Sequence, residues 1–318
     1  MNRNNGIKKS IVSKHRTVSG NWKTQLGYYA MILIPVLWIA LTKYVTMFGV
    51  YMAFIDYKPA KGILGSKFVG LKYFKEFFSS IDFVKVVSNT LLYNFGNLIL
   101  VSLLGGMFLA LLLYEIKSKK MNKLYQTCML LPSFLSWTVV SVALMTVLNP
   151  DRGVLNKVLE IVGMESVNWY VEAGYWPAII LVTMFIKGAG MCSIYFYSSL
   201  LAIDTELFDA ANIDGASRIK QIRYISLPAM TKVFCITLIG GIGNILESGI
   251  SPQYELTFNN GALYDTTLTL GIYQLNGLTG GRYAFTTAVG LVQSLVGLVL
   301  VLVTNGIVNR VDPESAMF

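Results

Sequence analysis

The sequence predicts an all-α protein that crosses a membrane several times. Of its 318 residues, 54% are hydrophobic and 14% are charged, and the mean hydropathy is +0.56. Soluble domains carry about 25% charged residues, so this chain has too little polar material to coat two water-soluble domains. Disorder is excluded because it requires low hydrophobicity, and the 28 Gly and 8 Pro show no collagen-like period.

Six apolar stretches are long enough to cross a bilayer, whose core requires about 20 mostly apolar residues per helix. They cover residues 26–50, 88–114, 127–148, 176–200, 229–250 and 286–309. The first stretch follows a basic tail, but it is too long for the apolar region of a signal peptide and it contains Pro35. We therefore interpret it as a retained span and expect six transmembrane helices.

The charges of the connecting segments predict the orientation. Basic residues gather in residues 1–25, 115–126 and 201–228 and at Arg310. By the positive-inside rule these segments are cytoplasmic, so both termini are cytoplasmic too, and 149–175 and 251–285, with few basic residues, lie outside. Segment 51–87 is an exception, because it carries six lysines against three acids, yet the helix count places it outside. We interpret the net charge of +9 as retention of cytoplasmic loops, without a nucleic-acid partner.

Two of the external segments have helical patterns. Residues 68–78 repeat apolar side chains at three- and four-residue spacing, which predicts an amphipathic helix along the outer membrane surface. Residues 149–175 hold a second short helical pattern. Trp169, Tyr175 and Trp176 fit an interfacial aromatic belt, and stacking on a sugar is the alternative role for each.

Several chemistries lack the residues they require. Cys128, Cys192 and Cys235 form no CxxC pair and lie in or beside apolar runs, so we expect buried thiols and neither a disulfide nor a zinc site. His15 is the one histidine, which excludes His-based catalysis inside the membrane. No phosphate-binding G-x-x-x-x-G-K-[ST] motif occurs. We expect no catalytic residue, metal or cofactor on this chain.

Residues 204–228 predict a helix, a turn and a second helix between spans four and five. Asp204 or Thr205 can cap a first helix that runs to Ile213. Its acidic side chains, Glu206 and Asp209, lie near the positive N-terminal end, and its face of Ala210 and Ala211 permits close approach by another surface. Gly215 permits a left-handed turn, and Leu227-Pro228 is expected to end the second helix.

This stretch resembles the EAA loop of type I ATP-binding-cassette (ABC) importer permeases. The resemblance rests on Asp209-Ala210-Ala211, then Gly215 after three residues, then Ile225 after nine more and Leu227-Pro228 after one more. The one departure is aspartate at 209 in place of glutamate, which keeps the charge and shortens the side chain. Asp214-Gly215-Ala216-Ser217 resembles the DGAS form of carbohydrate-importer permeases.

A second resemblance lies near the N-terminus. Residues 43–49, Ala53-Phe54 and 68–74 look like the larger permease of maltose importers, and more narrowly like the branch that imports oligosaccharides from complex polysaccharides. Residues 44–47 depart from it by lacking the proline commonly found there. The resemblance implies four segments: a basic tail (1–25), a first span with its external segment (26–84), a core permease domain (85–309) and a short tail (310–318).

The resemblance implies a non-catalytic translocation subunit in a bacterial plasma membrane. Helix 204–213 would be the coupling helix, seated in a groove of a cytoplasmic ATPase subunit. The implied partners are two ATPase subunits that carry ATP and Mg, a second permease, an extracellular solute-binding protein and an oligosaccharide. A heterodimer of permeases is favoured and a homodimer stays open. The alternatives are a permease for a non-sugar solute and an ion-coupled secondary transporter.

Polar side chains inside the spans are the candidates for the substrate path, because such groups are costly to place in lipid. They are Asn94, Asn97, Lys187, Tyr195, Tyr197, Asn244, Glu247 and Gln293. Amides can bond sugar hydroxyls and tyrosines can stack on a pyranose ring. Each has a structural alternative: helix association for the amides, core packing for the tyrosines, and an ion pair (with Glu247, for example) or snorkelling for Lys187.

Overall fold

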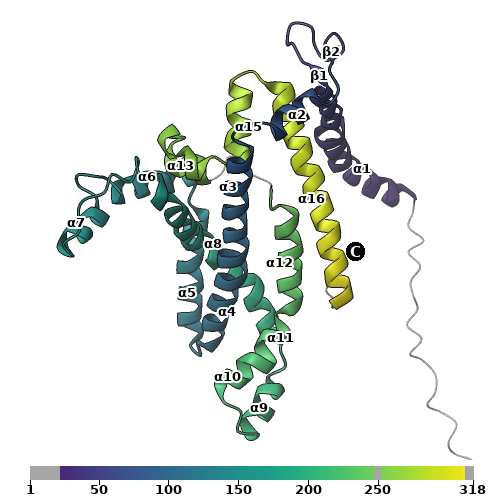
Figure 1. The fold of residues 1–318 in the computed structure, drawn as a ribbon. Helices are drawn as coiled ribbons and strands as arrows, with labels where there is room; N and C mark the ends of the chain where they lie inside the picture. The colour runs from purple at the N-terminus through teal and green to yellow at the C-terminus, as the bar shows by residue number, and fades with distance from the viewer. Residues whose placement is uncertain (1–21, 247–251, 312–318) are drawn as a thin grey trace, which may run out of the picture. The chain divides into compact units, whose positions relative to one another are not determined.

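The structure, a computed structural model, describes residues 22–246 and 252–311, which are mostly helical (Figure 1). Contacts divide the chain into two units, residues 1–51 and 52–318. In the first unit, α1 (Trp22–Ile39) continues into a π-helical turn, Ala40–Val45. A 3-10 stretch, Phe48–Phe54, crosses into the second unit.

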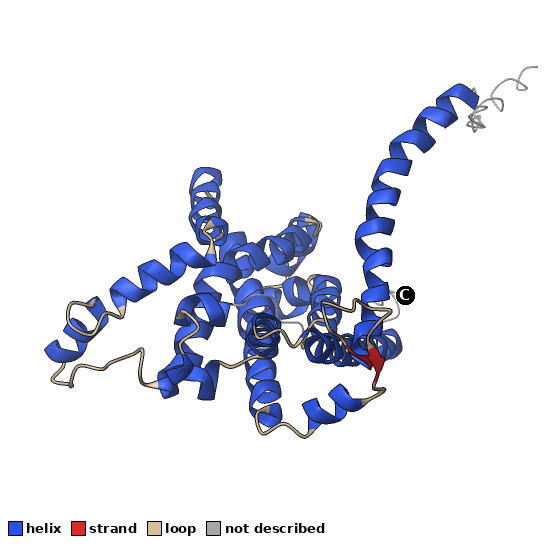
Figure 2. Cartoon of the chain, turned by 90° about the horizontal axis from the view of Figure 1, so that it is seen from above, coloured by secondary structure: helices blue, strands red, loops and turns tan. Residues whose placement is uncertain are grey.

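The second unit contains all the remaining elements. Its longer helices are α3 (Phe83–Gly96), α4 (Gly106–Glu115), α5 (Lys119–Leu130), α6 (Trp137–Val147), α8 (Trp176–Leu201), α12 (Thr231–Gly243), α15 (Leu270–Thr279) and α16 (Tyr283–Val311). The shorter ones are α2 (Lys72–Phe78), α7 (Val154–Ile161), α9 (Thr205–Ile213), α10 (Arg218–Gln221), α11 (Leu227–Ala229), α13 (Pro252–Thr257) and α14 (Tyr264–Thr267). π-helical turns join α3 to α4 (Asn97–Gly105) and α10 to α11 (Ile222–Ser226). Two short strands, β1 (Ile55–Asp56) and β2 (Lys67–Phe68), appear red in Figure 2.

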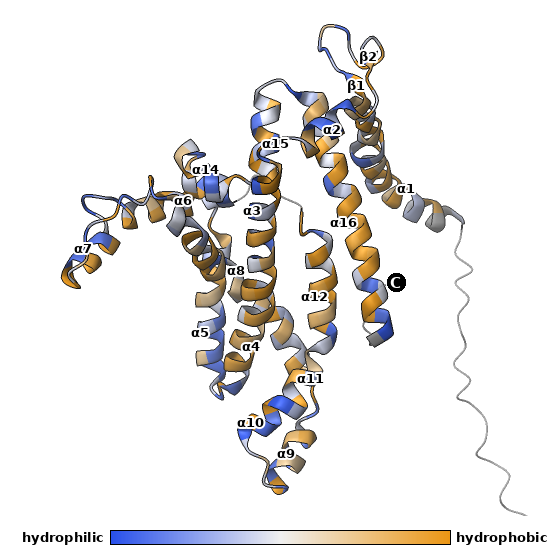
Figure 3. Ribbon diagram, viewed as in Figure 1, coloured by the Kyte–Doolittle hydropathy of each residue, from blue (hydrophilic) through white to orange (hydrophobic). Residues whose placement is uncertain are grey.

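The described helices allow six membrane crossings, as the sequence predicts. Four are long and apolar enough alone: Leu26–Phe54, Phe83–Glu115, Ala173–Leu201 and Tyr283–Arg310. Two more arise if each of two bent helix pairs is one span. Figure 3 shows the apolar character of α3, α4, α8, α12 and α16 along most of their length.

Three predicted boundaries are wrong. Stretch 127–148 is not one straight helix, because α5 and α6 meet at a bend of 95° after Pro132, which lacks an N–H. In stretch 229–250, α12 stops at Gly243 and a turn follows at 244–246, while residues 247–250 lie outside the described residues. Most of the predicted loop 115–126 is helical, because Ser118 caps α5 by accepting a hydrogen bond from the Met121 N–H.

The predicted helix 68–78 is shorter, and it packs on protein rather than only on the membrane surface. Phe68 lies in β2, opposite Ile55 of β1, and Gly70 turns the chain with φ +60° before α2 begins at Lys72. Phe77 is buried against the rings of Tyr273 and Phe285. Of the apolar residues that gave the spacing, Phe77 is buried, whereas Phe68, Leu71 and Phe78 stay exposed.

Burial also corrects the expected aromatic belt and the expected buried thiols. Trp169 and Trp176 are 7% and 0% exposed, so they belong to the core around α8, while Tyr175 is exposed. The thiols are less buried than expected, since Cys128 is exposed and Cys192 and Cys235 are half-buried. Composition does not distinguish these positions, because lipid-facing and protein-facing sides of a span are both apolar.

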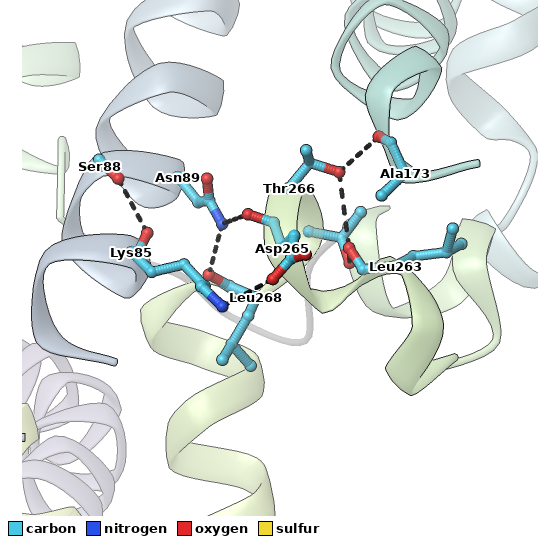
Figure 4. A network of polar contacts seen from close by, with 9 residues as sticks. Lys85, Ser88, Asn89, Ala173, Leu263, Asp265, Thr266 and Leu268 are labelled. Atoms are coloured by element: carbon cyan, nitrogen blue, oxygen red, sulfur yellow. Dashed lines mark hydrogen bonds and ion pairs between the residues drawn. The ribbon is translucent and has the colours of Figure 1, made fainter. Parts of the chain in front are cut away.

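A polar network joins α3 to the segment around α14 at one end of the unit (Figure 4). Lys85 Nζ lies 2.7 Å from Asp265 Oδ1, and Asn89 Nδ2 donates to the carbonyls of Asp265 and Leu268 at 3.2 Å each. Thr266 Oγ1 donates to Ala173 O at 2.7 Å, which ties the same segment to the start of α8. These bonds fix three elements that are far apart in sequence.

Asn156 organises the segment between α6 and α8. Its side chain is buried and donates to the carbonyls of Pro150 and Val167, and its Oδ1 accepts from the indole N–H of Trp169 at 2.8 Å. The indole of Trp176 in turn donates to Trp169 O at 2.7 Å. One amide therefore satisfies polar groups from three parts of the segment.

We expect Asn156→Ala to loosen residues 149–175, because it leaves buried donors and acceptors without partners, at a cost of about 2 kcal/mol. Limited proteolysis of the purified protein should cut this segment faster. The matched control is Asn168→Ala, an exposed amide in the same segment. Equal cleavage rates for the two variants would contradict the role of Asn156.

Candidate functional site: the coupling loop and a polar cleft

The first helix of the predicted coupling loop forms as expected. Asp204 caps α9, since its Oδ1 accepts a hydrogen bond from the Glu206 N–H at 3.0 Å. Glu206 and Asp209 are both exposed, as is Ala210, while Ala211 is half-buried. The acidic and alanine faces are therefore open to a partner.

The turn after α9 requires glycine, as the sequence predicts. Gly215 has φ +71°. The Ala216 N–H donates to Ala211 O at 2.9 Å and the Gly215 N–H to Asn212 O at 3.1 Å, which is the Schellman pattern of a helix C-terminus. Asp214 is the exposed C-cap residue, and Ser217 precedes α10 in an extended conformation. Glycine is required here by the left-handed backbone conformation and not by lack of space, because a Cβ on Gly215 would meet nothing within 4 Å.

The second helix ends one residue beyond Leu227-Pro228, close to the predicted end, at Ala229. The chain stays helical from Arg218 to Ala229 and bends by 54° where α12 follows. The π-helical turn Ile222–Ser226 shifts the hydrogen bonds, since the Leu227 N–H donates to Ile222 O, five residues back. The missing N–H of Pro228 is then tolerated at the start of the next helical turn.

Buried and charged side chains hold the two loop helices together and to α4. Gln221 is buried, and its Nε2 donates to Asn212 Oδ1 at 2.7 Å and Ala216 O at 3.2 Å. Arg218 lies 3.1 Å from Glu115 at the end of α4, and the rings of Tyr114 and Phe208 are 5.8 Å apart. Sequence reasoning missed Gln221 and Arg218, because their partners are distant or on another helix. The loop is thus a stiff unit attached to α4.

The loop exposes apolar side chains as well as charges. Leu207, Ile213 and Ile219 are 55%, 87% and 78% exposed. Beside them lies a hollow of about 520 Å³ between the end of α8, α9 and α11. It is lined by Ser199, Ala202, Ile203, Asp204, Leu207, Tyr224, Ile225 and Ala229. Exposed apolar side chains beside a hollow are typical of a surface that binds another protein.

A second candidate site is a polar cleft of about 410 Å³ between the end of α12 and α16. It is lined by Gly243, Asn244, Gly290, Gln293, Ser294, Gly297, Leu298 and Val301. The structure thereby brings together Asn244 and Gln293, two of the predicted path residues. Gln293 Oε1 accepts from Gln274 Nε2 at 2.8 Å, which fixes the orientation of its amide.

Glycine contacts bring the two helices together beside this cleft. A Cβ on Gly297 would lie 2.8 Å from the carbonyl oxygen of Gly243, so the two backbones meet without side chains between them. Hydrogen-bonding groups from Asn244, Gln293 and Ser294 surround the contact. The cleft offers amide and hydroxyl groups, which can hydrogen-bond the hydroxyl groups of a ligand.

The other predicted path residues do not line this cleft. Asn94 Nδ2 donates to Ile245 O at 2.6 Å, a bond from α3 to the turn after α12, and Asn97 is half-buried where the π-helical turn begins. Tyr195 is 55% exposed, and Tyr197 accepts a hydrogen bond from Asn122. Glu247 lies outside the described residues.

Lys187 takes a structural role that the sequence did not indicate. Its ammonium donates to the carbonyls of Leu135, Ser133 and Pro132 at 2.5, 3.0 and 3.4 Å, and lies 5.1 Å from the centre of the Trp137 ring. These carbonyls belong to the break between α5 and α6, where the Pro132 carbonyl also accepts the Leu135 N–H at 3.3 Å. Among the described residues, Lys187 therefore binds neither an acid nor the cleft.

Comparison with known proteins identifies the class. Residues 102–316 match the family described as "Binding-protein-dependent transport system inner membrane component". The chain is 33% identical, over 90% of its length and 89% of theirs, to two proteins of Bacillus subtilis strain 168: the polygalacturonan/rhamnogalacturonan transport system permease protein YteP and the protein LplB. A chain in the crystal structure of a bacterial ABC transporter that imports the acidic polysaccharide alginate matches at a TM-score of 0.83 and 30% identity, over 91% of this chain and 97% of that one.

These matches define a membrane-embedded transport subunit with the fold of an ABC importer permease. The chain belongs to the binding-protein-dependent transport system inner membrane component family. The resemblance found in residues 204–228 is confirmed at the level of the family.

We expect Gly215→Val to abolish uptake while the protein still reaches the membrane. A β-branched residue at φ +71° is strained, by about 1–2 kcal/mol, and would move α9 relative to α10. Gly215→Asn is the control, because asparagine tolerates this conformation. Transport assays on cells with matched protein levels make the comparison, and full uptake by the valine variant would contradict the requirement.

We expect Lys187→Met to lower the melting temperature and uptake together, because carbonyls at the α5–α6 break lose their donor at a cost of about 1–3 kcal/mol. The control is Lys123→Met, which removes an exposed lysine on α5. Thermal unfolding in detergent measures the difference. A melting temperature equal to that of the control would show that the break is held by other contacts.

Proposed function

We propose that this protein is the permease subunit of an ATP-driven importer that carries an oligosaccharide across a bacterial plasma membrane. The observation that carries the proposal is the coupling loop: a capped helix with an exposed acidic and alanine face, a turn that requires Gly215, and ties to α4. The polar cleft of Asn244, Gln293 and Ser294 supports a hydroxyl-rich solute. Relatives named for polygalacturonan, rhamnogalacturonan and alginate transport point to oligosaccharides derived from polysaccharides.

The importer requires partner proteins for ATP hydrolysis, for completing the substrate path and for delivering the sugar. ATP and Mg belong to two ATPase subunits, which bind the coupling loop on the cytoplasmic side, where the termini also lie. A second permease completes the path, with a heterodimer favoured over a homodimer. An extracellular solute-binding protein delivers the sugar, by analogy with the alginate transporter solved in complex with its pentasaccharide-bound periplasmic protein.

Movement of the loop reaches the cleft through α11 and α12. A displacement of α9 is transmitted to α4 by Arg218–Glu115 and to α12 through the continuous helix from Arg218 to Ala229. Because α12 meets α16 at the Gly243–Gly297 contact, tilting α12 changes the cleft beside it. The ATPases would thus bias the permease between two arrangements of these helices.

The test is purification of the tagged chain in mild detergent, with mass spectrometry of the proteins that co-purify. We expect a second permease and two copies of an ATPase. Reconstituted in liposomes, this assembly should take up a labelled oligosaccharide only with ATP inside and a loaded binding protein outside. Uptake driven by an ion gradient without ATP would favour an ion-coupled secondary transporter. Uptake of a non-sugar solute alone would favour an ABC importer permease for a non-sugar solute.

We expect Gln293→Leu to reduce oligosaccharide uptake about tenfold, because the cleft loses one hydrogen-bonding amide, and Gln274 loses its partner. The control, Thr287→Val, makes a similar polar-to-apolar change on α16 away from the cleft residues. Uptake by the assembly in liposomes is the measurement. Unchanged uptake by the Gln293 variant would remove this cleft from the substrate path.

A further inference from the structure

The segment before α3 presents a group of lysines that its own side chains do not neutralise. We define the lysine hairpin as residues 57–67 together with Lys72 and Lys75 of α2. Its lysines are Lys58, Lys61, Lys67, Lys72 and Lys75. All five are exposed, and none forms an ion pair with another described residue. The hairpin therefore carries an open positive surface.

The carboxylates nearby are already engaged with other partners. Asp56 accepts a hydrogen bond from the Tyr73 hydroxyl at 2.9 Å. Burial, and then this bond, raise the pKa of Tyr73 to about 12, so the phenol remains a donor at neutral pH. Glu76 pairs with Arg282, whose guanidinium lies over the Phe285 ring. Among the described residues no carboxylate of the segment forms an ion pair with a hairpin lysine, although Asp56 stands opposite Lys67 across β1 and β2 and Asp82 lies at the start of α3.

The hairpin has a defined shape with an apolar tip. The Lys58 N–H donates to Ser66 Oγ at 3.1 Å, and Ser66 Oγ–H donates to Gly62 O at 2.7 Å. Gly62 turns the chain with φ +66°. Leu64, at the apex, is 99% exposed. A large apolar side chain held in solvent by an ordered turn, with lysines around it, is typical of a contact surface.

The hairpin and the coupling loop lie at opposite ends of the second unit. The Tyr57 ring is 5.9 Å from that of Tyr283, where α16 begins, and the strands extend beyond this end of α16 (Figure 1). α9 and α10 lie at the other end. If the coupling loop is cytoplasmic, the hairpin is outside, where the positive-inside rule disfavours lysines. The lysines of the hairpin are therefore not explained by a role in setting the membrane orientation of the chain.

We propose that the lysine hairpin docks an acidic surface of the extracellular solute-binding protein, with Leu64 entering an apolar hollow on it. The inference rests on the proposed function. A binding protein approaches from the aqueous side, toward which the hairpin extends past the end of α16, whereas a lipid surface would lie alongside the span. Opposite charges would steer the encounter, and the apolar tip would fix the docked position.

The experiment uses the complete importer in phosphatidylcholine nanodiscs, with the binding protein that stimulates ATP hydrolysis by the wild type. The variant is Lys58→Gln/Lys61→Gln/Lys67→Gln, and the matched control is Lys119→Gln/Lys120→Gln/Lys123→Gln, three exposed lysines of α5. The readout is the concentration of loaded binding protein that gives half-maximal ATPase stimulation. Melting temperatures check the fold, since none of the three hairpin side chains bonds another described residue.

At about 50 mM NaCl we expect the hairpin variant to need about ten times more binding protein than the wild type, and at about 500 mM the difference should largely vanish. The control should follow the wild type. A further variant, Leu64→Ser, should need more binding protein at both salt concentrations, because an apolar contact is not screened.

Four outcomes would overturn the proposal. Equal half-maximal concentrations for hairpin variant and wild type at low salt would exclude electrostatic docking there. Loss of binding to phosphatidylglycerol vesicles with unchanged stimulation would identify a lipid contact, and a higher requirement for sugar alone would identify direct sugar binding. If no binding protein stimulates the wild type, the proposed function itself fails, and the docking proposal falls with it.

Discussion

The arrangement of the second unit depends on one lysine inside a span. A membrane-embedded helix cannot break without leaving carbonyl groups unpaired in a medium that offers them no water. At the α5–α6 break the Lys187 ammonium binds the carbonyls of Pro132, Ser133 and Leu135, and the Trp137 ring covers it. Because the bend is stabilised, α5 can follow α8 while α6 turns away, and the segment held by Asn156 can return to Trp176 at the start of α8. A charge that would be costly in lipid is thereby matched to a backbone defect that would be costly as well.

The proposed coupling loop and the polar cleft are joined mainly by helical segments, with a bend of 54° between α11 and α12. Gln221 ties α9 to α10, Arg218 ties both to α4, and the helix continues through Pro228 toward α12. Glycine contacts replace side chains where α12 meets α16. For a movement of residues 204–228 to tilt α12 against α16, the loop must move as one body and the α12–α16 contact must allow sliding.

Local patterns predicted local structure well. The fold class, the Asp204 cap and the left-handed turn at Gly215 follow from rules that act over a few residues, and all of them are found. The described helices allow four to six spans, which is compatible with the predicted six. The breaks and partners do not follow, because they depend on contacts distant in sequence: Lys187 with Ser133, Gln221 with Asn212, Phe77 with Phe285. Sequence placed Asn244 and Gln293 among the polar candidates, but it could not separate them from Asn94, which bonds a backbone carbonyl in the turn after α12. Burial in a membrane protein is equally hard to foresee, since Trp176 and an exposed Cys128 both lie in apolar runs.

The two indoles beside Asn156 give the protein a spectroscopic property, because tryptophan fluorescence depends on the surroundings of the ring. Trp169 and Trp176 are buried and hydrogen-bonded in one cluster, at the end of α8 that the network of Lys85, Asn89 and Thr266 joins to α3. Their emission spectra are set by this dry, polar-bonded environment, so any opening of the segment to water would shift their fluorescence to longer wavelength. With Trp22, Trp38 and Trp137 replaced, this pair would serve as an intrinsic optical reporter at the end of the unit opposite the proposed coupling loop, without any label attached.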